Sequence, residues 1–91
     1  MNKSGLIEAL ALEAGISAQE AGRVADTILA AMAESLAAGD NVELRGFGSF
    51  AVKEYESYYG HNPKTGEKIR IGAKKLPFFK AGKGLKEKVN R

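Results

Sequence analysis

The sequence predicts an α+β fold of two N-terminal helices, a three-stranded antiparallel sheet with a long protruding β-ribbon arm, and a short C-terminal helix. Two observations support this prediction. Apolar residues recur at helical spacing up to about residue 38, and from Val42 onward they alternate with polar residues, as they do in strands. Glycine and proline separate these segments. We expect a single domain, residues 1–91, with a helical part at 1–40 and a sheet part at 41–91.

The first helix is expected to start within the first few residues. Leu6 and Leu10 lie on one of its faces, Asn2 or Ser4 is available to cap its start, and Gly15 ends it. The connection to the next helix is short, so the two helices should pack as a helical hairpin.

The second helix opens at "SAQE", where Ser17 and Glu20 have the spacing of a capping box. Gly39 is a suitable residue to follow its last turn. Its apolar stripe consists of Val24, Ile28, Met32 and Leu36.

The sheet should begin with a hairpin. Val42 and Leu44 form its first strand, and the two glycines of "RGFGSF" at 45–50 permit a tight turn. Phe50 then resumes the alternation, and the second strand runs on into the arm, which covers about residues 55–73.

The chain returns from the arm through the alternating "KIRI" at 68–71 and closes the sheet with "LPFF" at 76–79. Pro77 cannot donate a hydrogen bond, so this strand should lie at an edge or contain a bulge. The segment "LKEKVN" then predicts a short last helix with Leu85 and Val89 facing inward.

Length and composition limit how such a chain can be stabilised. A chain of 91 residues buries only about 60% of the surface that it exposes when unfolded. There is no cysteine and the only histidine is His61, so we expect no disulfide, no metal site and no cofactor. Oligomerisation is the remaining means of stabilisation, and a dimer is expected.

The sequence also bears on location. No run of residues approaches the roughly 18 apolar positions of a membrane span, and the N-terminus does not resemble a signal peptide. We therefore expect a soluble, cytoplasmic protein with no membrane partner.

The charges are unevenly distributed along the chain. Residues 1–52 contain three basic and seven acidic side chains, a balance of −4, whereas residues 53–91 contain eleven basic and four acidic ones, a balance of +7. Such an asymmetry is expected where one end of a fold meets a polyanion, although a solvated lysine-rich surface would show it too.

Two other classes of function have weaker support. Catalysis is not indicated, because His61 lies on an exposed tip without a partner base, and no enzyme, nucleotide-binding or small-molecule motif is present. The alternative is a single-strand RNA-recognition module that would use Phe47 and Phe50 of "RGFGSF" as stacking platforms. That module needs a strand before its first helix and both rings exposed, whereas a core role buries them.

The arm favours DNA. It has too few apolar residues to pack on its own domain, so a partner should order it. The minor groove of DNA accepts a two-stranded ribbon, and the stiff ring of Pro63 at the tip is suited to enter between two base pairs and kink the duplex. Lys53, Lys68 and Arg70 can line one face of the hairpin. Further basic residues that can track the phosphates are Lys74, Lys75, Lys80, Lys83 and Lys86.

Three motifs, "RGFGSF", "GHNPKTGEKI" and "LPFFKAGKGLK", together with the two-helix start, resemble the bacterial HU/IHF family of histone-like DNA-bending proteins over essentially the whole chain. The resemblance implies an intertwined homodimer or heterodimer, formed by the helical part, whose shared core contains Phe47, Phe50 and Phe79. It also implies double-stranded DNA as the partner, an arm that carries Pro63 into a kinked base step, and a place in the bacterial nucleoid. In the nucleoid, the family organises DNA and assists recombination, replication or transcription. The DNA-binding candidates are completed by Lys3, Arg45, Tyr55, His61, Asn62 and Lys64.

The arm departs from the family pattern. His61 stands where members usually carry arginine, and "YESYY" supplies Tyr55, Tyr58 and Tyr59. These tyrosines could pack on sugars, hydrogen-bond phosphates or stabilise the ribbon as cross-strand pairs. Arg45 precedes the glycine turn much as in IHF, which leaves both sequence-specific and non-specific binding open.

Overall fold

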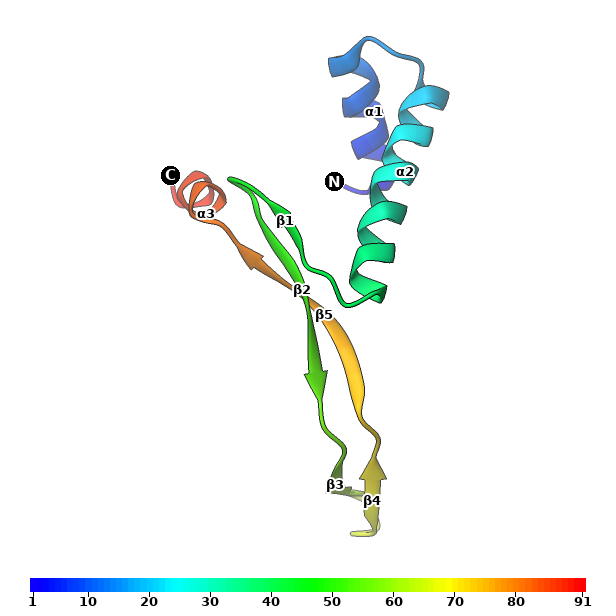
Figure 1. Ribbon diagram of the computed structural model, residues 1–91, viewed down its shortest axis with the longest axis vertical. Helices are drawn as coiled ribbons and strands as arrows, with labels where there is room; N and C mark the ends of the chain where they lie inside the picture. Colours follow the sequence, from blue (N-terminus) through cyan, green and yellow to red (C-terminus); the bar gives the residue numbers. More distant parts are fainter.

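The computed structural model describes residues 1–91 and is elongated, with dimensions of 58 × 32 × 28 Å. Its Cα radius of gyration is 18.9 Å, whereas a compact domain of this length has about 12 Å. Figure 1 shows the three parts that produce this shape: a helical hairpin, a twisted sheet that ends in a third helix, and a ribbon that projects away from both. The helices are α1 (Lys3–Ala14), α2 (Ala18–Ala37) and α3 (Lys83–Val89), and the strands are β1 (Val42–Leu44), β2 (Gly48–Tyr55), β3 (Tyr58–His61), β4 (Lys68–Ile71) and β5 (Lys74–Ala81).

The helical hairpin forms as predicted. Of the two candidate caps for α1, Asn2 is the one used: its side-chain oxygen accepts the Gly5 N–H at 2.8 Å. Such a cap contributes about 1 kcal/mol. Gly15 ends the helix with a left-handed φ of 67°. The two helices meet at Ala21 and Ala25 of α2, which are 0% and 3% exposed, because alanine lets the backbones approach closely.

Both ends of α2 also follow the prediction. Ser17 Oγ accepts the Glu20 N–H at 3.1 Å, which is the first bond of the expected capping box. At the other end Gly39 adopts a left-handed φ of 88°, and the Asp40 N–H reaches the Ser35 carbonyl at 2.9 Å. This is the 6→1 bond of a Schellman ending.

The sheet is antiparallel and has the order β1-β2-β5. Its register places Val42 opposite Phe50, and Phe50 opposite Phe79. β5 lies at the edge of the sheet, which confirms the expectation from Pro77. Pro77 pairs with Val52, and because no further strand lies beyond β5, its missing N–H leaves no hydrogen bond unmade.

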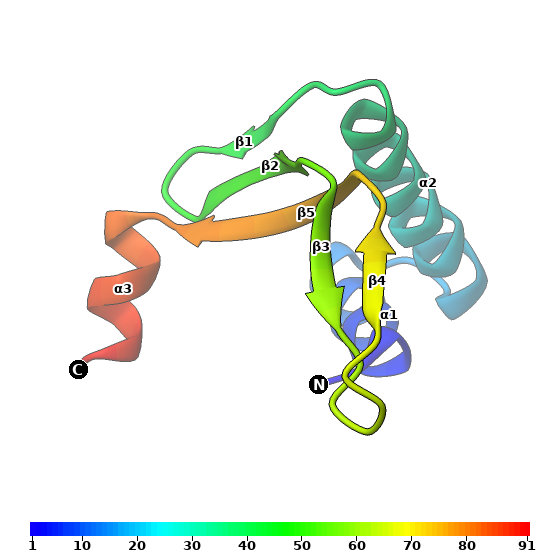
Figure 2. The same ribbon diagram turned by 90° about the horizontal axis from the view of Figure 1, so that it is seen from below.

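The arm differs from the prediction in one respect. Instead of two uninterrupted strands, each side is broken, so that β3 and β4 form a separate two-stranded sheet. The breaks fall at 56–57 and 72–73, where Gly72 supplies no side chain to a cross-strand pair. Two residues are skipped on each side, so the register stays in phase across the break. Figure 2 shows β3 and β4 running in a different direction from β2 and β5.

The last helix packs only partly on the sheet. A Cβ atom placed on Gly84 would lie 2.8 Å from the Gly46 carbonyl oxygen, so α3 lies tightly against the turn between β1 and β2. Leu85 is half-buried, as predicted. The inward orientation predicted for Val89 is wrong, because this side chain is 74% exposed. α3 has seven residues and nothing in the chain covers its final turn.

The chain has almost no closed core. Only Ala21, Ala25 and Gly48 are buried. The phenylalanines do gather, with the Phe50 and Phe79 rings 4.7 Å apart between centroids and those of Phe47 and Phe79 5.5 Å apart. Phe47 nevertheless remains 46% exposed, so the aromatic cluster is open on one side. The expected core residues are together, but one chain does not enclose them.

Gly48 provides a test of the sheet packing. A Cβ atom there would lie 2.5 Å from the Lys80 carbonyl oxygen and 2.5 Å from the Phe79 ring, so Gly48→Ala should lower the free energy of unfolding by about 1–3 kcal/mol. Gly72→Ala is the matched control, because nothing lies within 4 Å of its added Cβ atom. It should change stability by less than about 0.5 kcal/mol. Urea unfolding at one protein concentration measures both, and equal values would contradict the close packing at Gly48.

Candidate nucleic-acid interface

The strand register gathers basic side chains on one face of the ribbon. Side chains alternate between faces, and cross-strand partners share a face. Lys53 is opposite Leu76, and Lys80 is opposite Ser49 on the same face of the sheet. In the arm, Arg70 is opposite Tyr59. Lys53, Lys74 and Lys80 therefore share one face of the sheet, and Lys68 and Arg70 share one face of the arm; these two surfaces together are called here the basic face.

The basic face points away from the helices. Val52 and Pro77 belong to the opposite face, and they line a groove of about 360 Å³ together with Leu36 of α2. The opposite face also carries Phe50 and Phe79. One side of the sheet is therefore committed to apolar packing, and the other side is free to meet a ligand.

The carboxylates of the ribbon do not interrupt the paired positions of the basic face. Glu54 lies on the opposite side of the sheet, and Glu56 and Glu67 lie outside the paired strands. On that opposite side, Glu54 Oε1 is 3.5 Å from Lys75 Nζ. Lys75 was predicted to bind DNA beside Lys74, but the register separates the two lysines. Only Glu43, on β1, shares the basic face at the far end of the sheet.

Further basic residues extend this face toward α3. Arg45 and Lys80 line a shallow groove of about 320 Å³ beside the turn between β1 and β2. Lys83 and Lys86 follow on α3. Lys83 Nζ is 3.9 Å from Glu87 Oε1, an exposed pair of the kind that contributes less than about 1 kcal/mol. Arg45, Lys83 and Lys86 thus add three cations beyond the end of the sheet at which Lys80 lies.

The tip of the arm is held by Asn62. Its backbone carbonyl accepts the Gly66 N–H at 2.7 Å, and its side-chain oxygen accepts the Lys64 N–H at 2.9 Å. Gly66 has a left-handed φ of 71°, which the turn requires. Pro63 is exposed at this tip. The Asn62 side chain, predicted as a ligand contact, therefore has a role in shaping the turn that presents Pro63.

Lys3 stands apart from the other candidates. It begins α1, and its Nζ is 2.6 Å from Asp26 Oδ1 on α2. The structure therefore does not bring Lys3 to the basic face, and the sequence pattern alone could not show the ion pair, since the two residues are far apart in the chain.

Aromatic side chains on the basic face are paired with cations. Tyr59 lies opposite Arg70, and Lys68 Nζ is 4.6 Å from the Tyr59 ring centroid. Lys53 Nζ is 5.8 Å from the centroid of Phe78, which the sequence did not indicate as a site residue. The direct cross-strand pairs of this kind are Tyr55–Lys74, Tyr59–Arg70 and His61–Lys68.

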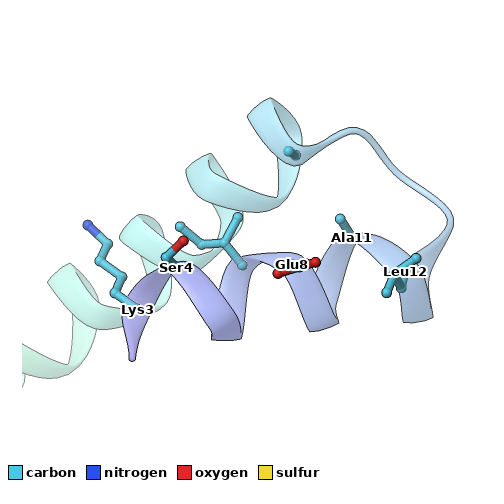
Figure 3. A pocket seen from close by; sticks show the side chains of 7 residues that line it. Lys3, Ser4, Glu8, Ala11 and Leu12 are labelled. Carbon is cyan, nitrogen blue, oxygen red and sulfur yellow. The ribbon is translucent and has the colours of Figure 1, made fainter. Parts of the chain in front are cut away.

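Other surface features offer no competing site. A hollow of about 740 Å³ lies along α1, lined by side chains that include Glu8 and Leu12 (Figure 3). It is larger than the groove at Lys80, but four of its seven lining residues are hydrophobic and its one cation, Lys3, is already paired with Asp26. No three His, Cys, Asp or Glu side chains are placed to hold a metal ion, and no helix has the length and apolarity needed to cross a membrane.

The RNA-recognition alternative is not supported. The chain opens with two helices rather than a strand. Phe50 packs on Phe79 and lies on the face that meets α2, and Phe47 belongs to the same cluster. Phe47 is partly exposed in the single chain, but the two rings do not form an open stacking surface.

Comparison with known proteins supports the same conclusion. The family model described as bacterial DNA-binding protein matches residues 1–90. The DNA-binding protein HU-beta of Salmonella typhimurium is 56% identical over 90 residues, which cover 99% of this chain and 100% of that protein. The Anabaena HU–DNA cocrystal structure has a TM-score of 0.88 at 43% identity, with 98% of this chain and 97% of that one covered. HU from Thermotoga maritima has a TM-score of 0.70 at 37% identity, with 98% of each chain covered.

The family that these comparisons identify consists of DNA-binding proteins and not of enzymes. The chain therefore belongs to the bacterial DNA-binding protein family that includes HU.

Proposed function

We propose that this protein is an architectural protein that binds double-stranded DNA in the minor groove and bends it, without performing chemistry. The observation that supports this most directly is the segregation of charge on the paired strands: Lys53, Lys74 and Lys80 share one face of the sheet, whereas Glu54 lies on the other beside Lys75. The likeness to the Anabaena HU–DNA cocrystal structure agrees with it. The single domain, 1–91, acts in the bacterial cytoplasm on the nucleoid.

Different parts of the basic surface have different roles in this proposal. Lys80, Lys83 and Lys86 hold phosphates that flank the bend, while Lys53, Lys68 and Arg70 hold those beside the arm. Arg45 and Lys74 add contacts at the two ends of the sheet. Each neutralised phosphate releases counterions, so these contacts supply affinity that falls as salt rises. They carry no sequence information by themselves.

The arm supplies the bend. Its tip is compact, because Asn62 organises the turn, and it presents the Pro63 ring to the outside. A stiff apolar ring that enters between two base pairs unstacks them at a cost of a few kcal/mol, and the bent DNA then meets more of the protein surface.

The protein acts as a dimer in this proposal. One chain leaves Phe47 and Phe79 exposed and buries only three residues, so a second chain is needed to cover the aromatic cluster and the apolar stripe of α2. Two chains also supply two arms, so that one arm can contact the DNA on each side of the centre of the bend.

The oligomeric state can be measured directly. We expect light scattering to give twice the chain mass of 9.7 kDa at micromolar concentration, and the midpoint of thermal unfolding to rise with protein concentration. A folded species of 9.7 kDa whose stability does not depend on concentration would contradict the dimer.

The lysines at the sheet end can be tested through salt. Replacing Lys80, Lys83 and Lys86 by glutamine should weaken binding to all duplexes similarly and reduce the slope of log K against log salt by about 0.9 for each phosphate that is no longer neutralised. Lys75→Gln is the control, because Lys75 lies on the opposite face beside Glu54 and should leave the slope unchanged. A triple variant with the slope of the unaltered protein would show that these lysines only solvate the surface.

Pro63 should matter for the shape of the DNA more than for folding. Pro63→Ala changes an exposed tip residue and should alter stability by less than about 0.5 kcal/mol. It removes the apolar ring that compensates for unstacking, so the bend angle, measured by energy transfer between dyes at the two duplex ends, should fall at saturating protein. Equal bend angles for both proteins would mean that the proline serves only the turn.

A further inference from the structure

Tyr58 and Tyr59 are neighbours in β3 but lie on opposite faces of the arm, which separates their roles. Tyr58 is opposite Ile71 on the face away from the cations, where it forms an ordinary ribbon-stabilising pair. Tyr59 lies on the other face, opposite Arg70 and below Lys68. Its side chain is also the most exposed of the three tyrosines, with 62% of the residue accessible.

We propose that Tyr59 is a DNA-contacting residue whose ring packs against the sugars of the minor groove and supplies affinity that does not depend on salt. This inference rests on the proposed function. The part of the DNA that contacts the ring is inferred from its chemistry. Lys68 and Arg70 beside the ring can bind phosphates. The sugar between two phosphates is the part of the DNA backbone that offers apolar C–H surface to the ring itself.

The geometry prepares the ring for this contact. Lys68 Nζ, 4.6 Å from the ring centroid, restricts the ring through a cation–π interaction, which at an exposed site contributes about 0.5–1 kcal/mol. Restricting the ring before binding lowers the ordering cost of the complex. The paired strands around the ring, β3 and β4, contain no carboxylate that would repel the approaching backbone.

The contact has a thermodynamic signature that separates it from the lysines. A cation that neutralises a phosphate releases counterions, so its removal changes the salt slope. A ring on a sugar removes apolar surface from water and releases none. Tyr59→Ala should therefore lower affinity by about tenfold at every salt concentration and leave the slope unchanged.

The experiment is fluorescence anisotropy with a duplex of about 30 base pairs at several salt concentrations. Tyr59→Phe keeps the ring and should bind like the unaltered protein. Tyr58→Ala is the matched control from the opposite face and should lower affinity by less than about twofold. Circular dichroism checks that each variant keeps its secondary structure.

Several results would overturn the inference. An unchanged affinity for Tyr59→Ala would show that the ring makes no contact, and a flattened slope would show that it acts only by holding Lys68. A loss of affinity with Tyr59→Phe equal to that with Tyr59→Ala would assign the contact to the hydroxyl group. Equal losses of affinity for Tyr58→Ala and Tyr59→Ala would mean that both serve the ribbon. If the unaltered protein does not bind the duplex, the proposed function fails instead.

Discussion

The apolar surface that one chain cannot bury is the constraint on which the rest of this structure depends. Its interior consists of little more than Ala21, Ala25 and Gly48, and the aromatic cluster around Phe79 is open. In the proposed dimer a second copy covers this surface, so the chain does not have to wrap its helices around its own sheet. The helices can therefore stand to one side, and the ribbon can project far from any support, which explains the elongated shape. The small size of the core and the reach of the arm are thus two results of the same arrangement.

The two-residue period of the strands concentrates basic side chains on one surface of a chain whose net charge is modest. The whole chain carries only +3, yet alternation sends Lys53, Lys74 and Lys80 to one side of the sheet and Glu54 to the other. The same alternation directs Phe50 and Phe79 toward the helices. A shift of the register by one residue would exchange both sets of side chains at once. Charge and core are therefore specified together, and Gly48, where a side chain would collide with β5, helps to fix the register that both require.

Local signals in the sequence predicted much of this structure. Capping by Ser17, the helix end at Gly39 and the edge position of Pro77 each depend on neighbouring residues, and each was predicted correctly. The candidate site was predicted less completely, because its geometry depends on pairing between distant residues. The Lys3–Asp26 ion pair joins two helices, and the separation of Lys75 from Lys74 follows from a register that no short motif encodes. The exposure of Val89 was missed for a related reason, since an apolar residue at helical spacing indicates an inward face only where something lies there to cover it.

The interruption of the ribbon at 56–57 and 72–73 has a mechanical consequence. Because two residues are unpaired on each strand, the joint is symmetric, and turning it does not require any hydrogen bond of β2 and β5 or of β3 and β4 to break. We therefore expect rotation of the arm to be concentrated in these four unpaired residues, 56–57 and 72–73, rather than in the paired strands on either side. Such a joint would let the arm follow the curvature of a bound duplex while the pairing of β2 with β5 is kept.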